Sequence, residues 1–130
     1  SGAIGVLNQS AAQADEKLKM FEAFAAGDAD AARGLCSPEL TATQNGGPQM
    51  DLDTVLHFAV AVKNAAPDFR YEDAIRSATD TGFVEEHRVR ASFKKGGETD
   101  LTVCIVGEVQ DGKITALREY FDPAGAAALA

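Results

Sequence analysis

The sequence predicts an α+β fold in which helices come first and antiparallel strands follow. Apolar residues recur at helical spacing in three segments of the N-terminal half, whereas the second half alternates between apolar and polar residues. Short glycine-containing turns separate the alternating runs, and such turns require antiparallel neighbours. A long curved sheet with three helices on one face would form a cone with a pocket between the two layers.

The size and charge of the chain limit what it can bind. The 130 residues fit one domain, which we expect over 14–130, after an N-terminal extension over 1–13 that need not be ordered. The net charge of −8 argues against nucleic acid and anionic membranes as partners. No apolar run approaches the ~20 residues of a membrane span, and the N-terminus lacks a signal-peptide pattern. A small molecule is the ligand class that these observations leave open.

The two cysteines bear on compartment and metal binding. Cys36 and Cys104 have neither a C-x-x-C spacing nor companion histidines, so we expect them to be buried free thiols. We therefore expect a reducing compartment, the cytoplasm, and neither a metal nor a cofactor.

Three helices are expected in the first half of the chain. The first spans 14–26 and ends at Gly27, and the second spans 29–36. The third spans 52–65, where one apolar stripe runs along the helix until Pro67 ends it.

The strands are expected around and after the third helix. A short strand spans 39–44 and is broken by the turn at 45–48. Gly107 lies inside an alternating run and is a candidate for a β-bulge that bends the sheet. Four longer strands form a meander over 68–78, 82–94, 98–110 and 113–122.

The last strand carries a carboxylate on an apolar face. Alternation after the Asp111-Gly112 turn puts Leu117, Glu119 and Phe121 on one face and Ile114 on the other. Burying a carboxylate is unfavourable unless the group is paired or neutralised, so Glu119 is a candidate functional residue. Alternation alone equally allows a surface glutamate on an edge strand.

Two stretches of the chain resemble the SnoaL-like branch of the nuclear transport factor 2-like superfamily. They are AFAAGDADAARGLCSPEL near the front and GEVQDGKITALREYFD at the back, and the second is similar to the final strand of limonene-1,2-epoxide hydrolases, GKITGWRDYFD. The likeness covers about residues 15–122. It implies a cone-shaped, cystatin-like α+β domain with a central pocket. It also implies a homodimer that forms through the convex face of the sheet.

The resemblance also implies a catalytic set. Glu119 stands at the position of the family's catalytic acid, and Asn45 at an asparagine that helps to hold the attacking water. Arg88 matches the arginine that bridges two carboxylates, so we expect it to bond Glu119. Arg90 stands where the second carboxylate would be, so either Glu86 substitutes as the acid or the site lacks a proton donor for opening an epoxide. The expected substrate-binding residues are Thr43, Arg90, Leu117, Phe121, Leu101, Val103 and Leu56.

Alternation by itself favours another placement of the charged strand residues. Glu86, Arg88 and Arg90 would then form a solvent face, with Val89 towards the core. The resemblance reverses this expectation, because a dimer contact on the convex face would bury Val89. On that view His87, of opposite parity to Arg88, lies at an interface.

Two hypotheses for the function follow. The first is a cofactor-independent hydrolase, isomerase or cyclase that uses Glu119 as general acid or base on a small apolar molecule. An enzyme of this kind would be epoxide hydrolase-like or isomerase/cyclase-like. The second is a non-catalytic ligand-binding or dimerisation module, in which Glu119 and Arg88 form a structural ion pair.

Overall fold

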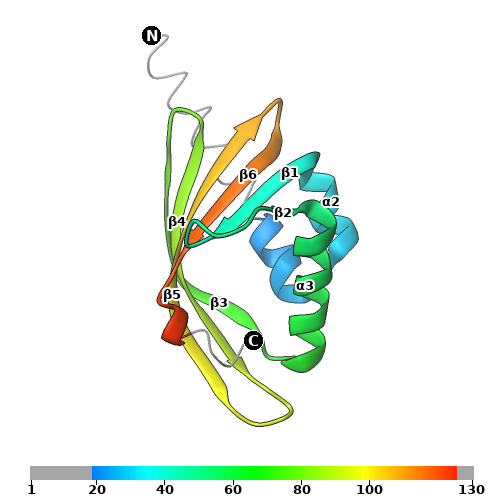
Figure 1. Ribbon diagram of the computed structural model, residues 1–130, viewed down its shortest axis with the longest axis vertical. Coiled ribbons are helices and arrows are strands. Elements are labelled where there is room, and N and C mark those ends of the chain that lie inside the picture. The colour runs from blue at the N-terminus through cyan, green and yellow to red at the C-terminus, as the bar shows by residue number, and fades with distance from the viewer. Residues whose placement is uncertain (1–18, 126–130) are drawn as a thin grey trace.

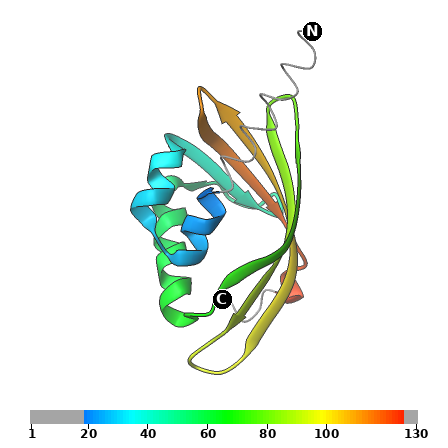
Figure 2. The same cartoon turned by 180° about the vertical axis from the view of Figure 1, so that it is seen from behind.

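Residues 19–125, the part of the chain that the computed structural model describes, place helices against the concave face of a curved sheet (Figure 1, Figure 2). Residues 19–26 are helical and are followed by α2 (Ala29–Leu35) and α3 (Leu52–Ala65). The strands are β1 (Cys36–Gln44), β2 (Met50–Asp51), β3 (Arg70–Ala78), β4 (Gly82–Ser92), β5 (Glu98–Gln110) and β6 (Lys113–Tyr120). Their order in the sheet is β2-β1-β6-β5-β4-β3.

The helices begin and end where local chemistry requires. The Asp28 side chain accepts the N–H of Ala31 at the start of α2, and the Asp51 side chain accepts the N–H of Thr54 at the start of α3. The bounds of α3 agree with the sequence prediction. By contrast, α2 ends one residue early, because the extended residue Cys36 already begins β1. The predicted start of the first helix lies outside the described residues.

Within residues 19–125, no helix is long and apolar enough to cross a membrane.

The sheet is mixed rather than wholly antiparallel. Strands β3 to β6 form the predicted antiparallel meander, but β1 pairs parallel with β6, and the two-residue β2 pairs antiparallel with β1. A parallel pair is possible here because the long segment between β1 and β6 leaves their relative direction free of any hairpin constraint. The parallel register brings the C-terminal ends of β1 and β6 to the same end of the cavity described below.

A bulge in β6 changes which side chains face the core. Val109 pairs with Ile114 whereas Glu108 pairs with Ala116, so Thr115 is an extra residue in the ladder. As a consequence, Ile114 is completely buried, although simple alternation placed it on the face opposite Glu119.

Gly107 makes room for an aromatic ring instead of forming the predicted bulge. It pairs regularly with Leu117, and a Cβ atom at this position would lie 2.4 Å from the ring of Phe83. We expect Gly107→Ala to destabilise the domain by about 1–3 kcal/mol, because the buried Phe83 ring has to shift. Chemical denaturation of Gly107→Ala, Phe83→Leu and the double variant checks this. Additive losses would contradict the steric explanation, since a smaller side chain at position 83 should relieve the clash.

Candidate active site

A cavity of about 440 Å³ lies between α3 and the concave face of the sheet. Its volume is within the range of small-molecule binding sites. Most of its wall is aliphatic or aromatic, including Val55 and Phe58 from α3 and Phe69 before β3. The polar or titratable side chains in the wall are Thr43, Gln44, Thr54, Tyr71 and Glu119. Such a site suits a mostly apolar ligand that is oriented by a few polar groups.

Glu119 brings a carboxylate into this apolar wall from β6. Gln44 lies opposite it in the parallel register and donates a hydrogen bond from Nε2 to Glu119 Oε2 at 3.1 Å. Burial raises the pKa of Glu119 above its ordinary value, and it outweighs the Gln44 hydrogen bond and the nearby His87, which act in the opposite direction. A carboxyl group with a raised pKa in a cavity is a candidate for taking up and releasing a proton during a reaction.

Tyr71 lines the same cavity from β3. Burial is the main cause that raises the pKa of its phenol, and the charges of Glu119 and Glu85 raise it further. The phenol therefore stays protonated and is available as a hydrogen-bond donor close to Glu119.

The other expected binding residues divide between the cavity and its surroundings. Asn45 does not line the cavity, because its side-chain Oδ1 accepts the N–H of Phe121 at 3.0 Å. Leu56 is buried in the hydrophobic core and is not among the residues that line the cavity. Five expected residues do line the cavity, namely Thr43, Leu101, Val103, Leu117 and Phe121.

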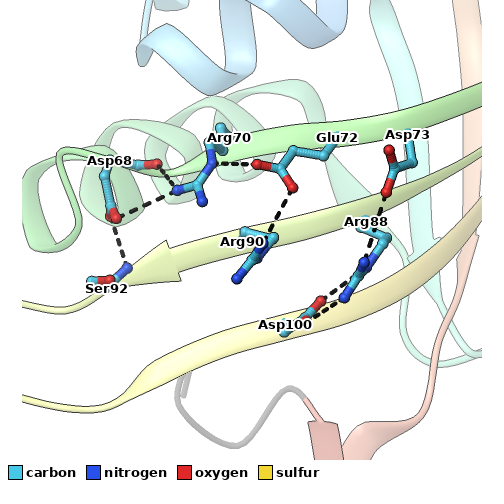
Figure 3. A network of polar contacts seen from close by, with 8 residues as sticks. All are labelled: Asp68, Arg70, Glu72, Asp73, Arg88, Arg90, Ser92 and Asp100. Carbon is cyan, nitrogen blue, oxygen red and sulfur yellow. Dashed lines mark hydrogen bonds and ion pairs between the residues drawn. The ribbon is translucent and has the colours of Figure 1, made fainter.

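Three of the charged residues of β4 lie on the convex face, contrary to what the resemblance implied. Glu86 is exposed, and Arg88 and Arg90 are about 40% exposed, with side-chain values of 41% and 42%. Arg88 donates from Nε to Asp100 Oδ1 at 3.1 Å and makes a second bond to the other carboxylate oxygen, as Figure 3 shows. The predicted bond between Arg88 and Glu119 is therefore wrong, and Glu86 and Arg90 are absent from the cavity.

The charged network on this face explains the placement. Arg90 lies 3.5 Å from Glu72, which also accepts a bond from Arg70 at 2.7 Å, and Arg88 reaches Asp73 at 3.7 Å (Figure 3). On the convex face these charged side chains pair with one another and stay in contact with water. In the cavity they would lose that water without gaining such partners. The homodimer expected across this convex face stays a prediction.

The inward-facing residues of β4 form a buried polar chain that the sequence analysis missed. Glu85 and His87 are each 1% exposed. Glu85 accepts a bond from Arg76 Nε at 2.8 Å and lies 2.6 Å from His87 Nδ1. Arg76 faces inward because β3 carries a bulge at Asp73, which has φ 55°. The sequence signal for this buried polar chain was alternation, because Glu85 and His87 fall on the same face of the strand as the apolar Phe83.

The imidazole of His87 lies directly behind the cavity wall. Its ring centroid is 4.3 Å from that of Tyr71 and 5.3 Å from that of Phe21. Its cross-strand partner Val103 and the next inward residue, Val89, both line the cavity. Nδ1 faces Glu85, while Nε2 has no hydrogen-bond partner within residues 19–125. The polar chain thus supports the wall that carries Tyr71.

A comparison with protein-family models gives one match, a SnoaL-like domain over residues 18–117. The chain belongs to the SnoaL-like domain family. No curated protein sequence matches it significantly.

Solved structures confirm the fold of this SnoaL-like domain. A proposed polyketide cyclase from Xanthomonas campestris pv. campestris superposes with a TM-score of 0.78 at 19% identity, over 95% of this chain and 98% of the other. A proposed polyketide cyclase from Streptomyces antibioticus gives 0.72 at 20% identity, over 90% and 96%. An epoxide hydrolase from M. tuberculosis, resembling limonene epoxide hydrolase, gives 0.72 at 18% identity, over 90% and 87%. At these identities the likeness establishes the fold alone.

Among the described residues, no group of three or more histidine, cysteine, aspartate or glutamate side chains could hold a metal ion.

Proposed function

We propose that this SnoaL-like domain is a cofactor-independent enzyme that moves a proton on a small, mostly apolar carbonyl compound, with Glu119 as general base and acid. The observation that carries the proposal is the raised pKa of a carboxyl group in an apolar cavity, where its hydrogen-bond partner is the neutral amide of Gln44. Because its pKa is raised, this carboxylate is a stronger base than an exposed glutamate, which suits it to remove a proton and to return it.

The reaction class follows from the groups beside Glu119. The ionised carboxylate takes a proton from the carbon next to a carbonyl group. The electron pair of that C–H bond forms a carbon–carbon double bond, and the π pair of the carbonyl group moves onto its oxygen to give an enolate. Tyr71, whose raised pKa keeps it protonated, donates a hydrogen bond to the developing oxyanion. Return of the proton to another carbon isomerises the compound. Attack of the enolate carbon on a second carbonyl of the same molecule closes a ring, and Glu119 then protonates the new alkoxide.

Two other interpretations receive less support. Opening an epoxide with water needs a base for the water and an acid for the leaving oxygen. The arginine-bridged pair of carboxylates expected for that reaction is not in the cavity, because Arg88 and Glu86 face outward. The non-catalytic alternative depended on an ion pair between Glu119 and Arg88, which the structure contradicts.

Proton exchange at carbon tests the proposal without knowledge of the natural substrate. We expect the protein to accelerate exchange of the α-hydrogens of bicyclic ketones such as 2-tetralone in D2O, followed by mass spectrometry, and Glu119→Gln to remove this acceleration. Limonene 1,2-epoxide serves as the parallel probe. Diol formation without ketone exchange would overturn the proposal in favour of a hydrolase. Ketone binding in thermal-shift assays, with neither reaction, would overturn it in favour of a binding module.

A further inference from the structure

The turn after β1 holds the backbone around Glu119. The N–H of Asn45 donates to the carbonyl oxygen of Glu119 at 2.8 Å, and Asn45 Oδ1 accepts the N–H of Phe121 at 3.0 Å. Asn45 adopts a left-handed conformation with φ 53°, which asparagine tolerates better than most residues. Because β1 turns away at this residue, the side chain of Asn45 takes the place of a backbone partner for Phe121.

The preceding residue holds the carboxylate itself. Gln44 Nε2 donates to Glu119 Oε2 at 3.1 Å, and the N–H of Gly47 closes the turn by donating to the carbonyl oxygen of Gln44 at 2.9 Å. Within residues 19–125, the other carboxylate oxygen of Glu119, Oε1, accepts no hydrogen bond. The same turn therefore holds both the backbone and one oxygen of Glu119, and it leaves the second oxygen free in the cavity wall.

We propose that Gln44 and Asn45 are positioning residues that anchor Oε2 of Glu119 and leave Oε1 as the oxygen that exchanges the proton with the ligand. This inference rests on the proposed function. The terminal torsion of a glutamate is broad, so an unanchored carboxylate would present either oxygen over a wide range of angles. Asn45 makes two hydrogen bonds to the backbone around Glu119, and Gln44 makes one to Oε2. Together they hold the Glu119 carboxylate in a single orientation, and proton transfer is sensitive to such geometry.

The anchoring of Oε2 is tested on the protein without ligand. We expect Gln44→Met, which keeps the length of the side chain but removes the donor, to raise the pKa of Glu119 further, because the hydrogen bond favours the ionised form. A carboxyl-carbon NMR titration of labelled glutamate measures this shift. Gln49→Met, the same replacement at an exposed site, is the matched control and should leave the titration unchanged. An unchanged pKa in Gln44→Met would overturn the inference.

The backbone contact is tested by a pair of substitutions at one position. Asn45→Gly retains the left-handed conformation but loses the acceptor, whereas Asn45→Asp retains both. We expect Asn45→Gly to lose hydrogen-exchange protection at the Phe121 amide and to slow ketone exchange about 10-fold through kcat rather than KM. Asn45→Asp should restore the protection and most of the rate. A loss of protection spread evenly over the domain would show a structural role alone and would overturn the inference.

The two readouts separate this inference from the proposed function. The Glu119 titration and the Phe121 amide report on positioning whether or not any ketone reacts. If both respond as expected but no ketone exchanges, the proposed reaction is wrong, and the claim that Oε1 exchanges a proton is overturned with it. If wild-type protein exchanges the ketone and Asn45→Gly does so at the same rate, the positioning claim is wrong while the proposed function stands.

Discussion

Glu119→Gln is expected to lower the rate of ketone exchange by about 10²- to 10⁴-fold, the usual contribution of a general base. Glutamine has the same length and can still accept the hydrogen bond from Gln44, but it cannot take up a proton. Rates measured by mass spectrometry with wild type and variant side by side check the loss. Glu86→Gln makes the same chemical change on the exposed convex face and should leave the rate unchanged.

The same variant carries a stability signature with a defined sign. Burial raises the pKa of Glu119 in the folded protein above the ordinary value of a glutamate side chain. The folded state therefore binds this proton more tightly than the unfolded state. The stability that results is fully present below the unfolded pKa and is lost as the pH rises through the folded pKa. The stability of Glu119→Gln minus that of wild type should consequently increase as the pH rises from acidic to neutral.

Urea denaturation at about pH 4 and pH 7 measures that difference, with Glu86→Gln as the reference. A carboxylate that stabilised the fold through an ion pair would behave in the opposite way, with the variant losing stability at neutral pH. That outcome would contradict the placement of Glu119 as an unpaired carboxylate in the cavity wall and would favour a structural role.

The second large effect is expected at the buried polar chain. Glu85→Ala should lower the free energy of unfolding by about 3–5 kcal/mol, because Arg76 and His87 then lose their shared partner inside the protein. Asp100→Ala removes the partner of Arg88 on the exposed face and should cost about 1 kcal/mol or less. Shifts of the urea midpoint at constant slope measure both losses.

A compensated variant separates charge from packing at this site. Arg76→Met combined with Glu85→Leu and His87→Phe replaces the whole chain by apolar groups of similar size, and it should recover much of the stability lost in Glu85→Ala. The phenyl ring also keeps the aromatic contacts to Tyr71 and Phe21. A loss in Glu85→Ala as small as that in Asp100→Ala would contradict this prediction, because it would show that the buried ion pair contributes little to the free energy of unfolding.

Local chemistry made much of the fold predictable from the sequence. Asp51 and Pro67 bracket α3, whose predicted bounds agree with the structure, and the bounds predicted for β5 also agree. Turn residues such as Asp111-Gly112 set the meander, because short turns allow only antiparallel neighbours. The parallel strand β1 and the two-residue β2 were harder to predict, since their pairing depends on residues distant in the sequence.

The candidate site was predictable only in part for the same reason. The alternation around Glu119 put it on a face with Leu117 and Phe121 but equally allowed an exposed glutamate, and the structure puts it in the cavity wall. For β4, alternation favoured charged residues outward, and this holds for Glu86, Arg88 and Arg90. The resemblance to epoxide hydrolases pointed the other way and was wrong at this strand, because these three side chains lie on the convex face, away from the cavity.

The sequence by itself determined the α+β class, the order of most elements and the placement of Glu119 among apolar neighbours, because each depends on periodicity, caps and turns that act over a few residues. Only the tertiary structure decided which face of β4 meets the cavity and which residues join Glu85. It also decided that Gln44 and Asn45 hold Glu119. These contacts join strands far apart in the chain, and two bulges, at Asp73 and Thr115, shift the side-chain parity that a sequence pattern assumes to be continuous.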